Sequence, residues 1–131
     1  MIVEKRVVDA VAAATGAPTF FGVQPQADDG QPAPLPVVIV NRTGARWASE
    51  FCGADTALAI TTIQVDSYAE TAEACRRIAD KARAAVRDLL DDAGKRIAPS
   101  LDSEVSFYDT ESRGWRVMQV WTPPEYQPSL P

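Results

Sequence analysis

The sequence predicts an α+β fold, in which a mostly antiparallel sheet of about four strands has two helices packed on one face. Two patterns carry this prediction. Ile63 and Val65 alternate with Gln64 and Asp66, which is the period of a half-buried strand. The segment that follows has apolar residues at three- and four-residue steps as far as Leu90, which is the period of an amphipathic helix. A strand that leads into such a helix lays the apolar stripe of the helix back across the sheet.

Length and composition are those of one folded domain. The chain has 131 residues, of which 46% are hydrophobic and 24% are charged, so we expect a single domain over residues 1–131. No apolar run is long enough to predict a membrane span, and the first residues do not have the pattern of a secretory signal. Cys52 and Cys75 are too few for a disulfide scaffold, which favours a reducing compartment.

Charge and residue types argue against several functions. The formal net charge is −5, and an acidic chain is a poor binder of the nucleic-acid backbone, because that affinity comes from neutralised phosphates. The chain has no histidine, and therefore lacks the commonest general base and the commonest metal ligand. The adjacent carboxylates Asp28–Asp29 and Asp91–Asp92 fit turn chemistry and a helix end better than a catalytic pair. We predict no enzyme, no cofactor and no metal site.

Local patterns place the other elements. Residues 2–15 predict a first helix, and a brief strand is consistent with the apolar run 19–23. The β-branched run 36–40 predicts a strand that is buried on both faces, or buried on one face and covered by a partner on the other. Two further strands are predicted at 104–108 and 115–122, and the prolines after the second one end it.

The central strand has a change of phase. Leu58 and Ile60 lie in opposite phase to Ile63 and Val65, which predicts a bulge or a change of buried face at Thr61–Thr62. We expect the strand to leave its own sheet at this point and to reach toward a neighbour.

The helix that follows has its own boundary signals. Ser67 and Glu70 fit a capping box. In this motif the serine side chain accepts the backbone N–H of Glu70, and the glutamate side chain accepts the backbone N–H of Ser67. The helix is then expected to run to about Ala93, with Gly94 as its C-terminal cap. The basic residues on this helix are interleaved with acids, which is typical of a solvated face.

Two segments are predicted to be irregular: a mobile loop near 41–57 and an extended tail near 123–131. The loop has two interpretations. It is an ordinary connection or extended hairpin, or it is a functional loop, because excursions of more than about 12 residues are uncommon in small domains without a role.

Aromatic residues are concentrated at strand ends and in the predicted loop and tail. One interpretation is that some of these aromatic residues belong to the core and the others lie on an ordinary surface. The other is a subunit interface, because aromatic residues are typical interface anchors and a thin α+β domain has a second sheet face to cover. The candidate interface residues are Trp47, Phe51, Trp115, Trp121 and Tyr126.

Four pieces of the sequence, in order, resemble the tail-completion or tail-terminator (tail-to-head joining) proteins of long-tailed bacteriophages. The first piece is the N-terminal helix, and the second is the proline-rich loop that leads into Leu35-Pro-Val-Val-Ile-Val40. The third is Ile63-Gln-Val-Asp-Ser-Tyr-Ala-Glu-Thr-Ala72 with its long helix. The fourth is the turn and strand Tyr108-Asp-Thr-Glu-Ser-Arg-Gly-Trp-Arg-Val-Met-Gln-Val-Trp121. Ser67 stands where a larger apolar residue is often found in that family.

The resemblance implies a structural virion protein made in the bacterial cytoplasm. Such proteins form a ring, typically hexameric, at the head-proximal end of the tail, where it ends tube polymerisation and joins the tail to the head connector. The implied partners are further copies of the chain, the tail tube protein and the head–tail connector protein, with DNA passing through the lumen without specific binding and no membrane involved. Two alternatives remain open: another head–tail connector component such as a stopper, and a small carboxylate-using enzyme or ligand-binding α+β domain.

Overall fold

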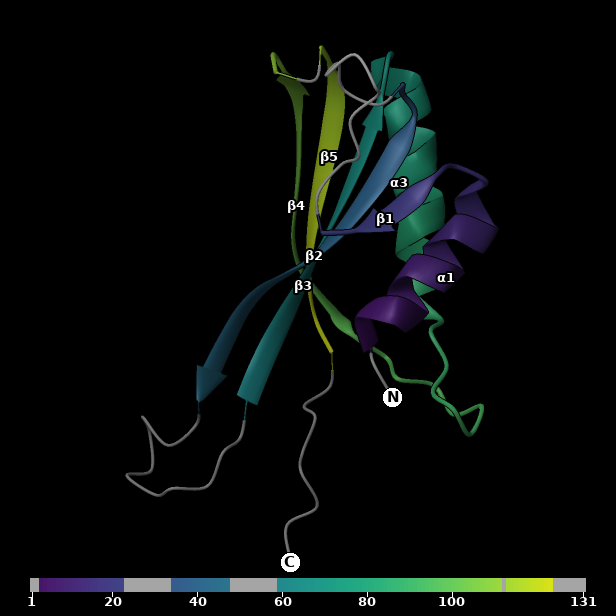
Figure 1. Cartoon of the computed structure of the whole chain (residues 1–131), viewed down its shortest axis with the longest axis vertical. Helices are drawn as coiled ribbons and strands as arrows, with labels where there is room; N and C mark the ends of the chain where they lie inside the picture. Colours follow the sequence, from purple (N-terminus) through teal and green to yellow (C-terminus); the bar gives the residue numbers. More distant parts are fainter. Residues whose placement is uncertain (1–2, 23–33, 48–58, 112, 124–131) are drawn as a thin grey trace, which may run out of the picture.

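In the residues that it describes, the computed structural model contains a five-stranded sheet and two helices, which confirms the predicted α+β class (Figure 1). It describes residues 3–22, 34–47, 59–111 and 113–123, with the backbone alone at 44–47 and 59–61. The strand order is β1-β2-β3-β5-β4, and neighbouring strands are antiparallel except for the parallel pair β1–β2. The elements are α1 (Val3–Thr15), β1 (Thr19–Phe21), β2 (Val37–Trp47), β3 (Ala59–Ala69), α3 (Ala72–Arg87), β4 (Ser100–Asp109) and β5 (Gly114–Thr122).

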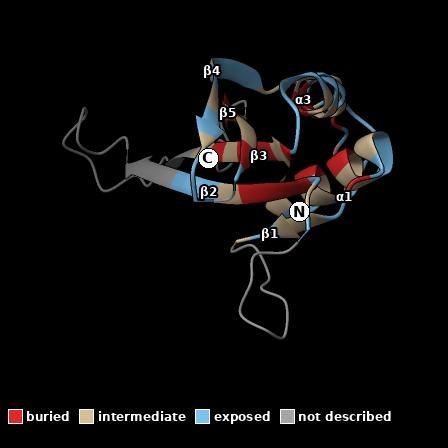
Figure 2. Cartoon of the chain, turned by 90° about the horizontal axis from the view of Figure 1, so that it is seen from above, coloured by how far each residue is buried: buried red, intermediate tan, exposed pale blue. Residues whose placement is uncertain are grey.

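Both helices lie on the same side of the twisted sheet, as Figure 2 shows. Their apolar stripes meet each other and the inward residues of the three central strands, so one continuous core fills the space between the layers. The buried members of this core are Val7 and Val11 of α1, Val38 and Val40 of β2, Ile63 and Val65 of β3, Ala82 and Val86 of α3, and Trp121 of β5, together with Ala17 and Leu89.

Strand β2 begins with four consecutive buried residues. Residues 37–40 are each at most 4% exposed, although successive side chains of a strand point to opposite faces of the sheet. This burial exists within the single chain. Of the two interpretations of the β-branched run, the structure therefore supports burial on both faces within the subunit.

The predicted start of the long helix is wrong by several residues. Ser67 lies inside β3 opposite Val117, and β3 continues to Ala69 opposite Trp115. The helix instead has Thr71 as its N-cap, whose side chain accepts the backbone N–H of Ala74 at 3.1 Å. The ladder to β5 and the burial of Ser67 outweigh the local capping signal.

The predicted end of the helix is also wrong. Helix α3 ends at Arg87, with Asp88 as its C-cap, so it does not reach Ala93. Beyond it the chain folds into a turn, where the Asp91 carboxylate accepts the backbone N–H groups of Ala93 and Lys95 at 2.8 and 2.9 Å. An aspartate that bonds nearby backbone amides offers the chain an alternative to helix.

The loop predicted near 41–57 begins too early. Residues 41–47 belong to β2 and pair with 59–64 of β3, while residues 48–58 lie outside the described residues, as does the tail from residue 124. The register of this pair shifts between Arg42 and Gly44, opposite Thr62. The bulge predicted at Thr61–Thr62 is therefore on the other strand: β3 pairs residue by residue from Ala59 to Tyr68, and the extra residue is Thr43 of β2.

Candidate assembly surfaces

A two-stranded arm extends from the body of the protein. Strand β5 pairs with β3 only from Ile63 to Ala69, whereas β2 and β3 stay paired as far as Trp47 and Ala59. The four β3 residues beyond Ile63 add about 14 Å at strand rise. Figure 1 shows the two strands running on together away from both helices. We call residues 43–47 and 59–62 the arm.

The arm is tied to the body near its base. The guanidinium of Arg42 lies 3.7 Å from the carboxylate of Glu4 in α1. The hydroxyls of Thr43 and Thr62 lie 2.8 Å apart across the bulge, so one donates to the other. A two-stranded ribbon by itself is marginally stable in water. Because the arm extends beyond the rest of the sheet, it is a candidate for contact with another chain.

Strand β4 forms a long edge of the sheet. In the part of the chain that the structure describes, β4 pairs on one side only, with β5. Most of its ten residues are exposed, and the apolar side chains Val105 and Tyr108 are 46% and 50% exposed. A long edge with exposed apolar side chains is a template for pairing with another strand. The edge also carries a bulge at Asp102, between Leu101 and Ser103.

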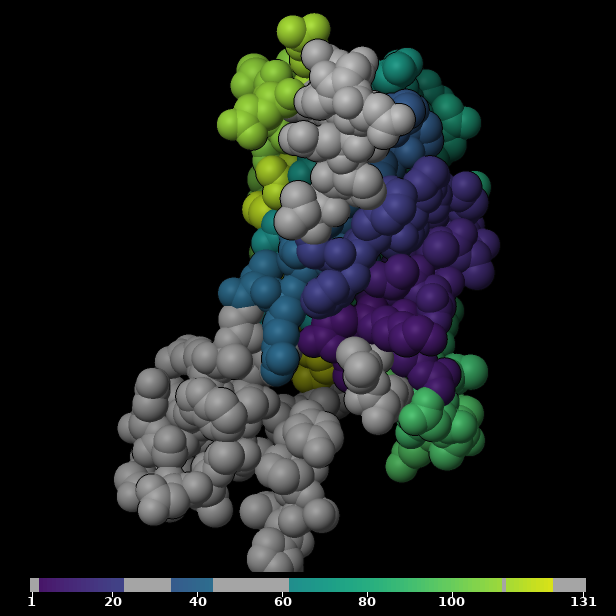
Figure 3. All heavy atoms as spheres, viewed as in Figure 1, coloured from purple at the N-terminus to yellow at the C-terminus, as the bar shows by residue number. Residues whose placement is uncertain are grey.

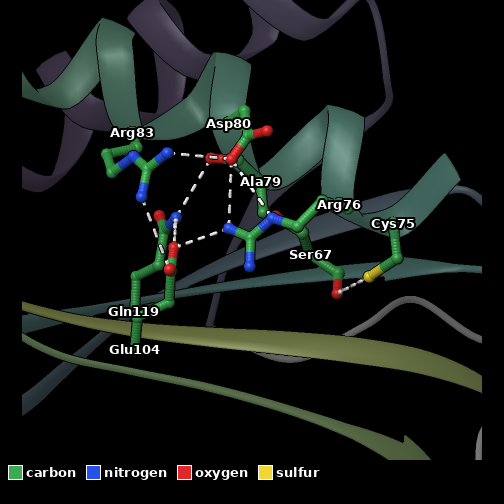
Figure 4. Close-up of polar contacts among 8 residues, drawn as sticks. All are labelled: Ser67, Cys75, Arg76, Ala79, Asp80, Arg83, Glu104 and Gln119. Carbon is green, nitrogen blue, oxygen red and sulfur yellow. Dashed lines mark hydrogen bonds and ion pairs between the residues drawn. The ribbon is translucent and has the colours of Figure 1, made fainter. Parts of the chain in front are cut away.

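A polar network fastens this edge to the helix layer (Figure 4). The Glu104 carboxylate accepts from Arg76 Nη2 at 2.9 Å and from Arg83 Nη1 at 3.5 Å, and both arginines also pair with Asp80. Gln119 Nε2 donates to Glu104 at 2.8 Å and to the Ala79 carbonyl oxygen at 3.0 Å. Strand β4 is therefore fixed relative to α3 even though its outer edge has no described partner strand.

The environment of Glu104 favours its charged form. Burial raises the pKa of this carboxyl, but the hydrogen bonds from Gln119 and Arg76, with the nearby arginine charges, outweigh burial and leave the pKa below its usual value. The side chain keeps 20% of its surface exposed, so its desolvation is incomplete. The network is consequently a stabilising ion cluster, with a role in holding the edge strand.

The opposite face of the sheet contains a second carboxylate–arginine pair. Asp66 of β3 is 2% exposed and accepts from Arg116 Nη2 at 2.9 Å and from Gln64 Nε2 at 3.0 and 2.8 Å. The guanidinium carbon of Arg116 lies 5.3 Å from the ring centre of Tyr68 and 5.4 Å from that of Phe107. This is cation–π distance, so the aromatic rings hold the arginine above the buried acid.

The pKa shifts around this pair are set by burial. Desolvation raises the pKa of Asp66, and the hydrogen bonds from Arg116 and Gln64 only partly offset it. Burial and the Asp66 charge raise the pKa of Tyr68 to about 12. A carboxyl with a raised pKa can act in catalysis, but it can equally be part of a structural ion pair. Here each oxygen of Asp66 is occupied by a donor of the sheet itself, which favours the structural role.

An open groove of about 650 Å³ lies between α1 and the end of α3. Charged residues of both signs line it, and they pair locally: Lys5 lies 3.7 Å from Asp9, and Arg6 forms an ion pair with Asp92. Figure 3 shows α1 meeting the segment after α3 on this side of the molecule. The titratable residues that line the groove are exposed or half-buried, so the groove has the character of a helix–helix junction.

The predicted interface aromatics fall in different places. Trp121 is 2% exposed and belongs to the core, so its ring is not available to a partner in the isolated chain. Trp115 is half-buried and meets Tyr108 edge-on, with ring centres 5.7 Å apart. Trp47 ends β2 on the arm, with its side chain not described, and Phe51 and Tyr126 lie outside the described residues.

Sequence reasoning missed both carboxylate–arginine pairs and the β4 edge. Asp66 and Arg116 are 50 positions apart, and Arg76 and Glu104 are 28 apart, so no local spacing connects them. The alternation of β4 gave a weak signal, because acids and serines separate its apolar residues. Only the strand order reveals that β4 lies at an edge.

The described residues contain no cluster of three or more His, Cys, Asp or Glu side chains that could hold a metal ion. Cys75 is buried, and its single S–H lies within donating distance of two carbonyl oxygens, those of Ser67 at 3.1 Å and Trp115 at 3.3 Å. Burial raises the pKa of this thiol, which keeps it protonated and unreactive. None of the described helices is long and apolar enough to cross a membrane.

Comparison with known proteins identifies the class of this fold. A chain from the virion of a native gene transfer agent particle matches with a TM-score of 0.60 and 16% sequence identity, over 94% of this chain and 93% of that chain. At this identity the likeness establishes a shared fold. A family model described as tail completion protein gp17 matches residues 5–121. The chain therefore belongs to the tail completion protein gp17 family, and it is a structural protein of a phage tail. No curated protein matches the sequence.

Proposed function

We propose that this protein is a tail terminator, which forms a hexameric ring at the head-proximal end of the tail. The ring ends polymerisation of the tail tube and presents a surface to the head–tail connector. The observation that carries the proposal is the family match over residues 5–121. The structural features that support it are an arm and an edge strand with backbone groups directed outward, since both are suited to contacts between chains.

The charge of the chain fits a ring through which DNA passes. With a net charge of −5, the subunit has little electrostatic attraction for phosphates. A lumen lined by such subunits lets DNA slide without specific binding. The tail tube protein and the connector protein are then the partners on the two sides of the ring.

Assembly in the presence of tail tubes tests this function. Tail tube protein is polymerised with and without a stoichiometric amount of this protein, and tube lengths are measured by negative-stain electron microscopy. We expect shorter tubes of defined length, with extra density at one end, and a native mass of six copies for the ring. Tubes that grow to the same length with the protein present, and bare at both ends, would contradict the proposal.

The position in the particle separates the terminator from a stopper. A terminator binds purified tubes in the absence of the head connector, and a stopper binds the connector in the absence of tubes. Co-sedimentation with each purified partner therefore decides between the two: binding to the connector alone would overturn the terminator assignment.

A further inference from the structure

The sheet has two outer edges that face in opposite directions. On one side, β1 covers β2 only from Val38 to Val40, and the last described contact there is the N–H of Gly22 donating to the Val40 carbonyl oxygen at 2.9 Å. Beyond it, no described strand pairs with the outer side of β2 over residues 41–47. On the other side, the whole length of β4 is an outer edge among the described residues. We call these the β2 edge and the β4 edge.

One copy of the chain cannot join its own two edges. Strands β3 and β5 lie between β2 and β4 in the sheet, so the edges point away from each other. Each edge can find a partner strand only on another molecule. Contact between two different surfaces of identical chains is head-to-tail, and such contacts generate closed rings when the rotation between copies closes.

The two edges carry opposite charge. The β4 edge contains Asp102, Glu104 and Asp109, and no basic residue. The β2 edge contains Arg42 and Arg46 over residues 41–47 and no acidic residue, and Arg42 also lies 3.7 Å from Glu4 of α1. Opposite charges on neighbouring strands stabilise their pairing, whereas like charges directly opposite each other destabilise it. The pattern therefore favours pairing of one edge with the other.

The same charges disfavour the symmetric alternatives. Two β4 edges would bring acids together, and two β2 edges would bring arginines together. Asp102 is the only exposed residue of the three acids, and its carboxylate accepts from the Thr122 hydroxyl, whereas Glu104 and Asp109 are half-buried and lie within ion-pair distance of arginines. Charge on an edge strand is a device that blocks pairing with the wrong strand, and here the block leaves the basic edge as the permitted partner.

We propose that the β2 edge of one copy, residues 41–47, pairs with the β4 edge of the next copy, so that the sheet continues from subunit to subunit. The proposal rests on the proposed function in that the copies form a ring. It names the second copy of this chain as the occupant of both edges. The arm then gains a third strand on its β2 side, which provides the stability that a two-stranded ribbon lacks.

Cross-linking between two singly substituted chains tests the pairing. Both chains carry Cys52→Ser, and the buried Cys75 is kept. One chain carries Ala45→Cys in the β2 edge, and the other carries Ser103→Cys or Ser106→Cys in the β4 edge. The chains are mixed, assembled on tail tubes and treated with a short bis-maleimide. Mass spectrometry then identifies the linked peptides.

We expect links between the Ala45→Cys chain and the β4 chain, and few links within either population. A matched control carries Lys81→Cys on the exposed side of α3, where no link to the Ala45→Cys chain is expected. Rings that form without the mixed link, or that link equally to the Lys81→Cys control, would overturn the pairing but leave the ring intact. Failure to form rings at all contradicts the proposed function itself, and the pairing with it.

Charge reversal gives a second and independent measurement. Arg46→Glu or Asp102→Lys alone is expected to weaken association at least about tenfold, a change of about 1.4 kcal/mol. The double variant with both reversals is expected to recover most of the association, because the attraction is restored with its sign exchanged. Native mass spectrometry measures assembly, and the thermal midpoint of each isolated chain is the folding control. A double variant weaker than either single variant contradicts the pairing.

Discussion

The two faces of the sheet hold the same kind of ion pair in different surroundings. On the helix-covered face, Glu104 meets two arginines and a glutamine and keeps 20% of its side chain exposed. On the opposite face, Asp66 meets one arginine and one glutamine and is 2% exposed. The pKa of Glu104 is lowered, whereas the pKa of Asp66 is raised. The donors are of similar type in both pairs, so burial decides the direction of the shift.

The difference has opposite consequences for stability. Glu104 releases its proton more readily in the folded chain than in the unfolded one, so its interactions stabilise the fold above the ordinary glutamate pKa and are lost as pH falls through the lowered pKa. Asp66 holds its proton more tightly in the folded chain, so its charged form costs stability as pH rises through the raised pKa. The charge of Glu104 therefore stabilises the fold, whereas the charge of Asp66 lowers its stability.

The largest expected effect comes from the core on the helix-covered face. Trp121→Ala should lower the free energy of unfolding by about 3–5 kcal/mol, because it leaves a cavity where β3 and β5 separate. Trp115→Ala, at a half-buried position, should cost less. Urea denaturation of both variants measures the difference. Equal losses would show that the two tryptophans contribute equally to the core.

Breaking the pair on the opposite face should have a comparable but pH-dependent effect. Arg116→Met should cost about 3 kcal/mol at pH 7, because it leaves Asp66 charged and buried without its strongest partner. The loss should shrink as the pH falls through the raised pKa of Asp66, since the carboxyl can then take up a proton. Urea denaturation at pH 7 and below this pKa measures it, with Asp66→Asn/Arg116→Met as the control that removes both charges. A loss that does not change with pH would contradict the buried position of the acid.

The network around Glu104 should give the smallest of these effects. Glu104→Gln should cost about 1 kcal/mol at pH 7, since it keeps the shape of the side chain and removes its charge. The difference from wild type should begin to shrink near the ordinary glutamate pKa of about 4.3 and should vanish once the pH has fallen below the lowered pKa of Glu104. Thermal unfolding across pH measures it. Arg77→Gln, in an exposed pair with Glu73, is the control with no expected change. A loss that persists at low pH would point to packing as its cause.

Local patterns predicted the helices and strands because each of them places its apolar residues at a regular spacing along the sequence. The alternation through Val65 predicted β3, and the apolar stripe through Val86 predicted α3. Helix α1 ends at Thr15, where the predicted first helix ends, and Gly16 follows it with a positive φ of 69°. These signals are set by backbone geometry and by the period with which side chains return to one face, so a single segment contains all the information they need.

The tertiary structure decided what those local signals could not. It moved the start of α3 from Ser67 to Thr71, because the β5 ladder extends to Ala69. It placed Trp121 in the core of the chain, while the aromatic content alone fitted an interface equally well. It also placed β4 at an edge of the sheet and left β2 paired with β1 over only three residues. Strand order depends on contacts between residues far apart in the chain. Those contacts are set by the summed packing of the whole sheet, which no short stretch of sequence contains.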